Sequence, residues 1–205
     1  MNPVTLVSGF IPLVLFGLLN GPVPLAAAAA IGAAASVIIA LITIRRGTAA
    51  LAIVQAIALA AFSVTAATSS PETLTWLGSY GLGIPSLALA AYMLLTAPFA
   101  PFTAAYARAS VPRQAWGTPR FTDTNRRISA AWGVTVLILG LSHLATAAIG
   151  TSALPRFQAH LAEWGPAVVA AILAIRYTRR TITRAHDAPA AAPHPESGYQ
   201  PTHPE

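Results

Sequence analysis

The sequence has 205 residues, of which 55% are hydrophobic and only 9% are charged. Soluble globular domains carry about 25% charged residues, so most of this chain's surface must face something other than water. Cysteine is absent, which excludes disulfides, thiolate metal ligands and thiol nucleophiles. The net charge of +6 does not indicate nucleic-acid binding, because the basic residues stand at the ends of apolar segments instead of forming one face or tail.

Six apolar segments approach the roughly 20 residues that a transmembrane helix needs. They cover residues 4–20, 25–44, 48–68, 74–97, 128–150 and 160–177. Turn-forming sequences separate them, such as Asn-Gly-Pro-Val-Pro at 20–24 and Ser-Ser-Pro at 69–71. This pattern predicts an all-α, polytopic membrane helix bundle of about six transmembrane helices over residues 1–184. We expect the first segment to be retained, since it lacks the basic n-region of a signal peptide; cleavage after it is the alternative.

All twelve basic residues are arginine, and their positions predict the topology. Eleven lie in alternate connections, namely Arg45, Arg46, Arg108, Arg113, Arg120, Arg126, Arg127, Arg176, Arg179, Arg180 and Arg184. Only Arg156 lies in a connection on the other side. Because cytoplasmic loops are enriched in basic residues, we predict a plasma-membrane protein with both termini in the cytoplasm.

The longest connection, residues 98–127, combines aromatic and basic side chains. Phe99, Phe102 and Tyr106 are spaced by three and four, which predicts a short helix with its rings on one face. We expect this helix to lie in the cytoplasmic membrane interface, with guanidinium groups at lipid phosphates. Residues 185–205 are rich in proline and lack large aliphatic side chains, which predicts a disordered cytoplasmic tail.

Small residues are frequent inside the segments, including Gly17 with Gly21 and Gly32 with Ser36. Small residues four apart let helices approach closely, so these pairs predict a compact bundle. A homodimer seam on the second segment is the alternative. Glycines and a proline at residues 78–85 predict a loose start to the fourth helix, and an unwound stretch of the kind that marks substrate sites in some transporters is the alternative.

Ionisable residues inside the segments are nearly absent, and no carboxylate falls at mid-membrane. This argues against a proton- or sodium-coupled transporter. His143 is the one histidine inside a segment, and with Arg156, His160 and Glu163 it forms a candidate polar cluster at the outer end. The main interpretation is a polar rim in contact with lipid headgroups, and a small outward-facing polar site is the alternative.

Motifs for catalysis are missing, including HExxH, GxSxG, the P-loop and paired aspartates. With six acidic residues, three of them from Asp187 onward, metal-dependent chemistry is poorly supplied. Haem ligation would need paired histidines on facing helices, and His160 is the only possible partner for His143. We therefore predict no catalytic residue, no cofactor and no metal site, while leaving enzymatic activity open.

One stretch contains Trp116, then Pro119-Arg120-Phe121, then the run Asn-Arg-Arg-Ile-Ser-Ala-Ala-Trp-Gly at 125–133. It follows Arg-Arg-Gly at 45–47, a Ser-Pro-Glu turn at 70–72 and a Pro-Phe pair at 98–99. Across roughly residues 35–145 this pattern resembles bacterial membrane proteins related to intracellular septation protein A (YciB-like). The resemblance implies an inner-membrane protein associated with cell-envelope synthesis and division, without established catalytic residues. The chain departs from that family by its arginine-only basic set, its sixth helix and its proline-rich tail.

The same stretch has a physical interpretation of its own. Asn125, Ser129 and Trp132 are four and three apart and share a helix face, with Asn125 as the expected cap and Trp132 in the aromatic belt. Anchoring of the fifth helix is the main interpretation, and lipid binding or protein contact is the alternative. The candidate contact residues are Arg108, Arg113, Trp116, Arg120, Asn125, Arg126, Arg127 and Trp132.

Taken together, the missing catalytic groups and the basic, aromatic loop predict a non-enzymatic scaffold or interaction protein of the bacterial cell envelope. Its expected partners are anionic lipid headgroups at the cytoplasmic face and a second copy of the chain or another membrane protein. One alternative is a membrane-embedded enzyme that acts on a lipid or isoprenoid in a pocket at the outer cluster. Another is a small passive transporter or channel for a neutral or apolar solute, with a cavity lined by Thr65, Thr68, Ser86, Thr135 and Ser142.

Overall fold

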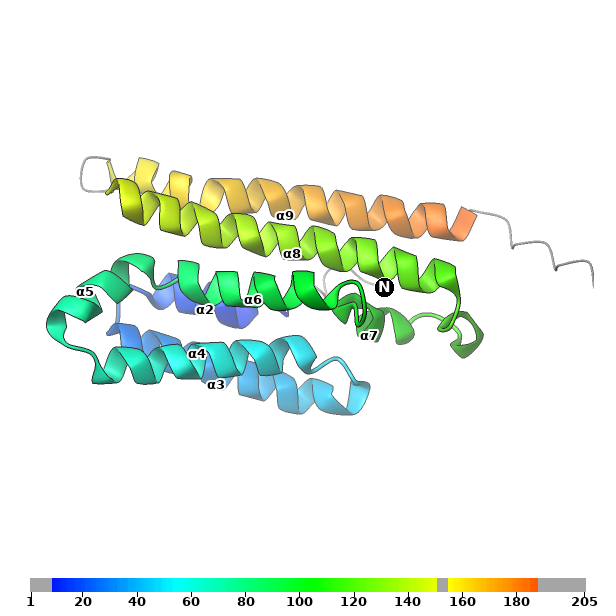
Figure 1. Ribbon diagram of the computed structural model, residues 1–205, viewed down its shortest axis with the longest axis horizontal. Helices are drawn as coiled ribbons and strands as arrows, with labels where there is room; N and C mark the ends of the chain where they lie inside the picture. Colours follow the sequence, from blue (N-terminus) through cyan, green and yellow to red (C-terminus); the bar gives the residue numbers. More distant parts are fainter. Residues whose placement is uncertain (1–8, 151–154, 188–205) are drawn as a thin grey trace, which may run out of the picture.

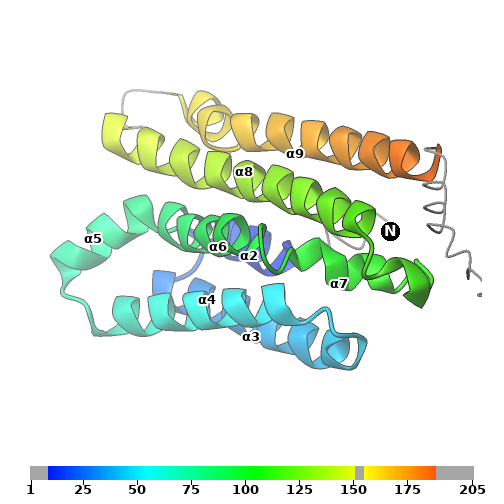
Figure 2. The same cartoon turned by 45° about the vertical axis from the view of Figure 1, so that its right-hand side comes forward.

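A computed structural model describes residues 9–150 and 155–187, and every regular element in this part of the chain is helical. The long helices are α3 (Leu25–Thr43), α4 (Ala50–Thr68), α8 (Pro119–Ile149) and α9 (Arg156–Asp187). The shorter elements are α2 (Ile11–Leu19), α5 (Pro71–Tyr80), α6 (Gly83–Thr96) and α7 (Phe102–Arg108), with the 3-10 turns η1 (Ile44–Arg46) and η2 (Arg113–Ala115). Figures 1 and 2 show three layers, formed by α8 with α9, α2 with α6, and α3 with α4.

Four helical stretches are long and apolar enough to cross a membrane: Leu25–Arg46, Ala50–Thr68, Pro119–Ile149 and Phe157–Ala185. The pair α5 and α6, bent by 53°, forms a fifth candidate span. These are the helices of a multi-pass membrane protein, and the all-α prediction is confirmed. The count of six is not, because residues 4–20 are described only from residue 9 and α2 contributes nine helical residues there.

The outward faces of the long helices are apolar. Leu41 in α3, Ile57 in α4 and Leu173 in α9 are 67%, 65% and 58% exposed. Large aliphatic side chains exposed on several helices form a surface that suits hydrocarbon and not water. The burial pattern therefore agrees with the composition in placing this bundle in a bilayer.

The fourth predicted segment is two helices instead of one. The break falls at residues 81–82, between α5 and α6. A Cβ on Gly81 would lie 2.7 Å from the carbonyl oxygen of Leu77, so the bend needs a residue without a side chain. The glycines that predicted a loose start thus mark a sharp change of helix direction.

The two longest helices extend beyond their predicted segments. α8 starts at Pro119 instead of Ile128, and α9 continues to Asp187 instead of ending at Tyr177. With 31 residues α8 is about 46 Å long, more than the ~30 Å hydrocarbon core. Hydropathy detects only the part inside hydrocarbon, and the extra turns carry arginines. The predicted tail therefore begins within α9, and its residues from 188 onward lie outside the described residues.

The start of α8 is capped by Thr118, and the prediction of Asn125 as the cap was wrong. The Oγ1 of Thr118 accepts a hydrogen bond from the Phe121 backbone N–H at 3.2 Å. Asn125 lies further along the helix, where its Nδ2 donates to the Phe121 carbonyl oxygen at 2.8 Å. Threonine satisfies an otherwise unpaired N–H of the first turn, as a cap must.

Glycine lets α6 and α8 pack closely. An added Cβ at Gly83, Gly133 or Gly140 would come within 2.6, 2.8 or 2.9 Å of a leucine side chain on the facing helix. Close approach gains dispersion energy, which is a main source of helix association in lipid. The predicted pair Gly32 and Ser36 is also buried within the bundle, which favours internal packing over a homodimer seam on that face.

A buried polar contact fastens α7 to α8. The Oγ1 of Thr103 donates to the Asn125 carbonyl oxygen at 2.9 Å and lies 2.9 Å from Ser129 Oγ, which accepts the Thr103 N–H at 3.3 Å. Phe102 is buried beside this contact, whereas Phe99 precedes the helix and is 87% exposed. The expectation that the three rings of this region share one face was therefore wrong at Phe99.

Candidate functional site

The two ends of the bundle differ in charge. Figure 1 shows the turn after α3, the region of α7 and the last turns of α9 at one end, and α5 with the start of α9 at the other. We call the first end the basic end, because the turn after α3, the loop from α7 to the start of α8, and the second half of α9 carry eleven arginines between them, all of them exposed. The fold therefore brings together three arginine-bearing segments that are distant in the sequence.

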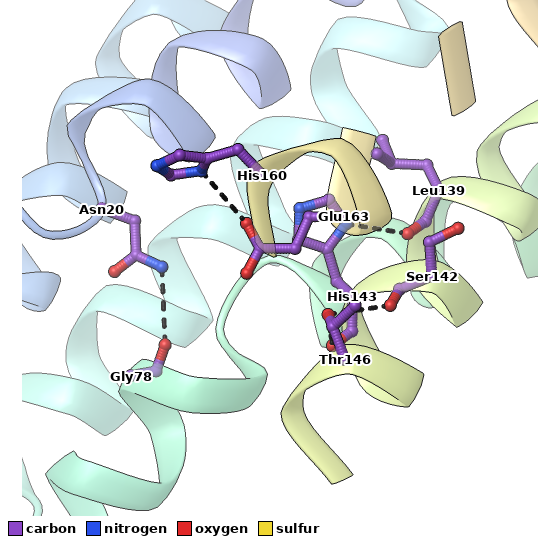
Figure 3. A network of polar contacts seen from close by, with 8 residues as sticks. All are labelled: Asn20, Gly78, Leu139, Ser142, His143, Thr146, His160 and Glu163. Atoms are coloured by element: carbon purple, nitrogen blue, oxygen red, sulfur yellow. Dashed lines mark hydrogen bonds and ion pairs between the residues drawn. The ribbon is translucent and has the colours of Figure 1, made fainter. Parts of the chain in front are cut away.

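A polar pocket of about 490 Å³ opens at the opposite end. Residues from α2, the α5–α6 region, α8 and α9 line this polar pocket: Gly17, Asn20, Gly78, Ser79, Leu82, His143, Ala147, Gly150, His160, Glu163 and Trp164. Three residues of the predicted outer cluster, His143, His160 and Glu163, thus lie around one cavity (Figure 3). The side chain of the fourth, Arg156, lies outside the described residues.

His143 is held in a fixed orientation. Its Nδ1 lies 2.9 Å from the carbonyl oxygen of Leu139, and its ring stands edge-on to Trp164 with 5.3 Å between ring centres. Because a carbonyl only accepts, Nδ1 carries the hydrogen and Nε2 of the neutral ring is an acceptor. His143 is 8% exposed and lies about 9 Å along α8 from its last residue, Ile149.

Glu163, His160 and Asn20 complete the polar lining. The Nδ1 of His160 lies 3.5 Å from Oε2 of Glu163, with the two side chains 73% and 27% exposed. The Nδ2 of Asn20 donates to the carbonyl oxygen of Gly78 at 3.5 Å, which links the end of α2 to α5 (Figure 3). Asn20 was not among the predicted site residues. Its place in a turn sequence was the available signal, and it was interpreted only as a turn former.

Within the described part of the chain, no group of three histidine, cysteine, aspartate or glutamate side chains is arranged to hold a metal ion. The side chains that line the polar pocket offer hydrogen bonding by one carboxylate, two imidazoles, one amide and one hydroxyl. These groups can orient a ligand that carries several hydrogen-bond donors.

The polar residues expected along a transport path do not line the polar pocket. Thr65 and Thr68 are exposed on α4, and their hydroxyls donate to carbonyl oxygens of their own helix. The hydroxyls of Ser86, Thr135 and Ser142 also donate to carbonyl oxygens of the preceding turn. Such bonds satisfy the hydroxyl groups locally, so these residues need no water-filled passage.

At the basic end, two arginines lie over one tryptophan ring. The guanidinium carbons of Arg108 and Arg113 are 5.5 and 5.7 Å from the ring centre of Trp116, within the range of cation–π attraction. The Nε1–H of Trp116 donates to the Val111 carbonyl oxygen at 2.9 Å, which fixes the ring in the loop. Three predicted contact residues are thus brought together, and two positive charges are held near each other.

Three further predicted contact residues are exposed around this group. Arg126 pairs with Asp123 at 3.6 Å, and the Nη2 of Arg120 donates to the carbonyl oxygen of Arg184 at 3.4 Å. Arg127 follows on the exposed side of α8. The basic surface of this end is therefore formed by the loop between α7 and α8, the first turns of α8 and the last turns of α9.

Asn125 and Trp132 are buried: Asn125 lines a pocket together with Arg120, whereas Trp132 lies inside the bundle, which corrects its prediction as a lipid or partner contact. They are 2% and 3% exposed. Trp132 stacks on Phe10 with 5.5 Å between ring centres, and its Nε1–H donates to Thr178 Oγ1 at 3.2 Å. The shared face of Asn125 and Trp132 is real, but it points into the bundle.

Comparisons with family models, with curated proteins and with solved structures find no match to the chain. The resemblance to the intracellular septation protein A family therefore stays a prediction, and function has to be inferred from the two ends of the bundle.

Proposed function

We propose that the chain is a multi-pass plasma-membrane protein of the bacterial cell envelope that acts as a scaffold or interaction protein, with its basic end in the cytoplasm. The observation that carries this proposal is the gathering, at one end of an apolar bundle, of three segments whose eleven arginines are all exposed. Asp123 is the one carboxylate among the described side chains of that end. An excess of basic residues on one side favours the cytoplasm, and the resemblance to septation protein A supports an envelope role.

The basic end fits anionic lipid headgroups. An arginine close to an anionic membrane surface contributes about 1 kcal/mol of attraction. Stacking on Trp116 orients Arg108 and Arg113, and a tryptophan at headgroup depth prefers the membrane interface. An acidic segment of a partner protein would be attracted by the same charges.

The proposed orientation predicts a labelling pattern. The chain has no cysteine, so single cysteines report without background. Gln114 at the basic end and Thr73 at the other end are both exposed. We expect a membrane-impermeant maleimide to label the Thr73→Cys variant in intact spheroplasts and the Gln114→Cys variant only after permeabilisation. The opposite pattern would place the arginines outside and overturn the orientation.

Removing the stacked arginines is expected to weaken lipid binding. Because each contributes about 1 kcal/mol, Arg108→Gln with Arg113→Gln should reduce affinity for phosphatidylglycerol about tenfold or more. Titration of the purified protein with this lipid, read by native mass spectrometry, measures the change. The matched control, Arg45→Gln with Arg46→Gln, removes the same charge from the same end and is expected to lose less. Unchanged affinity in both variants would contradict lipid binding by the basic end.

The interaction role has a separate test in native membranes. A cross-linker attached to the Gln114→Cys variant is expected to capture a membrane protein or a second copy of the chain, with a yield that falls when Arg108 and Arg113 are replaced. Thr183, exposed in the last turns of α9, provides a second attachment point. If neither position captures any protein, the scaffold proposal loses its support.

A further inference from the structure

We propose that the polar pocket, together with an apolar groove beside it, binds a membrane lipid that has a primary ammonium headgroup. This site is at the opposite end from the basic surface. The proposal requires only that the bundle lies in a bilayer, so its test is independent of the scaffold role.

The apolar groove has a volume of about 210 Å³ and runs between α2, α8 and α9. Trp164 lines both the groove and the polar pocket, so the two spaces are neighbours at this residue. From Trp164 to Ile175, which also lines the groove, α9 advances about 16 Å. That length is about half of the ~30 Å hydrocarbon core, which is the length that one acyl chain spans there. The groove therefore matches a single acyl chain whose headgroup lies in the polar pocket.

The groove is open toward the surrounding lipid. Val14 on α2 and Val168 on α9 line it and are 41% and 52% exposed. A lipid can enter sideways from the bilayer without any opening of the helices. A polar cavity beside a lipid-facing apolar groove suits an amphiphile better than a fully water-soluble ligand.

The polar pocket presents hydrogen-bond acceptors. His143 uses Nδ1 for the Leu139 carbonyl, so Nε2 of the neutral ring accepts. Asn20 uses Nδ2 for the Gly78 carbonyl, which leaves Oδ1. Glu163 faces His160 through Oε2, which leaves Oε1. An imidazole nitrogen, an amide oxygen and a carboxylate oxygen match a donor with three N–H groups and a positive charge, as in a primary ammonium ion.

The contact between His160 and Glu163 at the rim leaves the carboxylate available to a ligand. His160 is 73% exposed, and exposed pairs of this kind contribute little. Glu163 is more enclosed, at 27%, so a ligand ammonium that displaces water from it makes a stronger charge-assisted hydrogen bond. The exposed rim leaves the headgroup phosphate in contact with water.

Headgroup preference is measured by tryptophan quenching. Trp132 and Trp164 both line the groove, and they are the remaining fluorophores once Trp76→Phe and Trp116→Phe remove the two other tryptophans from every variant compared. The full chain is placed in phosphatidylcholine bilayers and titrated with phosphatidylethanolamine, phosphatidylglycerol or phosphatidylcholine brominated in the acyl chains. We expect phosphatidylethanolamine to reach half-maximal quenching at a mole fraction about tenfold lower than the other two. N-methylation of its headgroup should remove this preference stepwise. Identical curves for the three lipids in the wild-type protein would overturn the proposal.

Two pairs of variants locate the site. Glu163→Gln should abolish the preference, whereas Glu72→Gln, which removes an exposed carboxylate from the first turn of α5, should keep it. Val168→Phe fills the groove and should weaken binding, whereas Val169→Phe, at a neighbouring lipid-facing position 58% exposed, should not. A preference that survives Glu163→Gln, or binding that Val168→Phe leaves as strong as Val169→Phe does, contradicts the proposal. Loss of the headgroup preference when soluble phosphoethanolamine is added would also contradict the proposal. The site would then bind the free headgroup without needing the acyl chain.

Discussion

Replacing Trp132 by alanine is expected to destabilise the bundle by about 3–5 kcal/mol. The side chain is 3% exposed, stacks on Phe10 with 5.5 Å between ring centres and donates to Thr178 Oγ1 at 3.2 Å. Truncation would leave a cavity beside α9 and an unpaired buried hydroxyl. In lipid the lost free energy of unfolding comes mainly from dispersion contacts and the hydrogen bond. Moving apolar surface from lipid into the protein core contributes little, because both are apolar.

The measurement is unfolding in mixed micelles by titration with sodium dodecyl sulfate, followed by circular dichroism. Trp76→Ala is the matched control, since Trp76 is 53% exposed on α5, and its loss is expected to stay below about 1 kcal/mol. Trp132→Phe keeps a ring for Phe10 but leaves Thr178 unpaired, which should cost about 1 kcal/mol. Equal losses at Trp132 and Trp76 would contradict the buried placement and favour an aromatic-belt position.

The grouping of the arginines could be predicted because guanidinium groups are costly to place in hydrocarbon, so each apolar segment moves the chain to the other side. The turn at Arg45, the loop at Arg113 and the last turns of α9 do lie toward one end (Figure 1). The start of α8 could not be predicted as well. Hydropathy identifies only the apolar part of α8. The helix extends from there toward its N-terminus through polar residues as far as Pro119.

The direction in which a helix face points was harder to predict than the face itself. The spacing of Asn125, Ser129 and Trp132 correctly indicated one face, and all three are buried. In water an apolar face must turn inward, but in a bilayer both the core and the surroundings are apolar. The pattern therefore does not distinguish a face that packs in the bundle core from a face that contacts lipid, and this is why the prediction for Trp132 was wrong.

Part of the polar pocket was accessible from the sequence. His143, His160 and Glu163 stand out as polar residues in or beside apolar segments, and they line one cavity. Asn20 and the apolar groove were missed, because α2 reaches α8 and α9 only through the tertiary fold. No spacing rule connects residues that are more than one hundred positions apart.

Gly140 offers the other large expected effect. A Cβ there would lie 2.9 Å from Leu87 Cδ2 and 3.2 Å from the Leu87 backbone nitrogen, so a larger side chain must separate α8 from α6. We expect Gly140→Leu to cost about 3 kcal/mol in the same titration, although leucine favours the helical conformation by about 1 kcal/mol relative to glycine. The local and the tertiary effects thus oppose each other, and the clash should win.

Gly78→Leu separates these two effects, because Gly78 lies in α5 and an added Cβ meets nothing within 4 Å. It keeps the gain in helix propensity without the clash, so its stability should be unchanged or up to about 1 kcal/mol higher. Gly140→Ala should fall between the two, since only the first added carbon has to be accommodated. If Gly140→Leu were as stable as Gly78→Leu, the close packing of α6 on α8 would be wrong, because no rearrangement of Leu87 alone could make room beside its own backbone nitrogen.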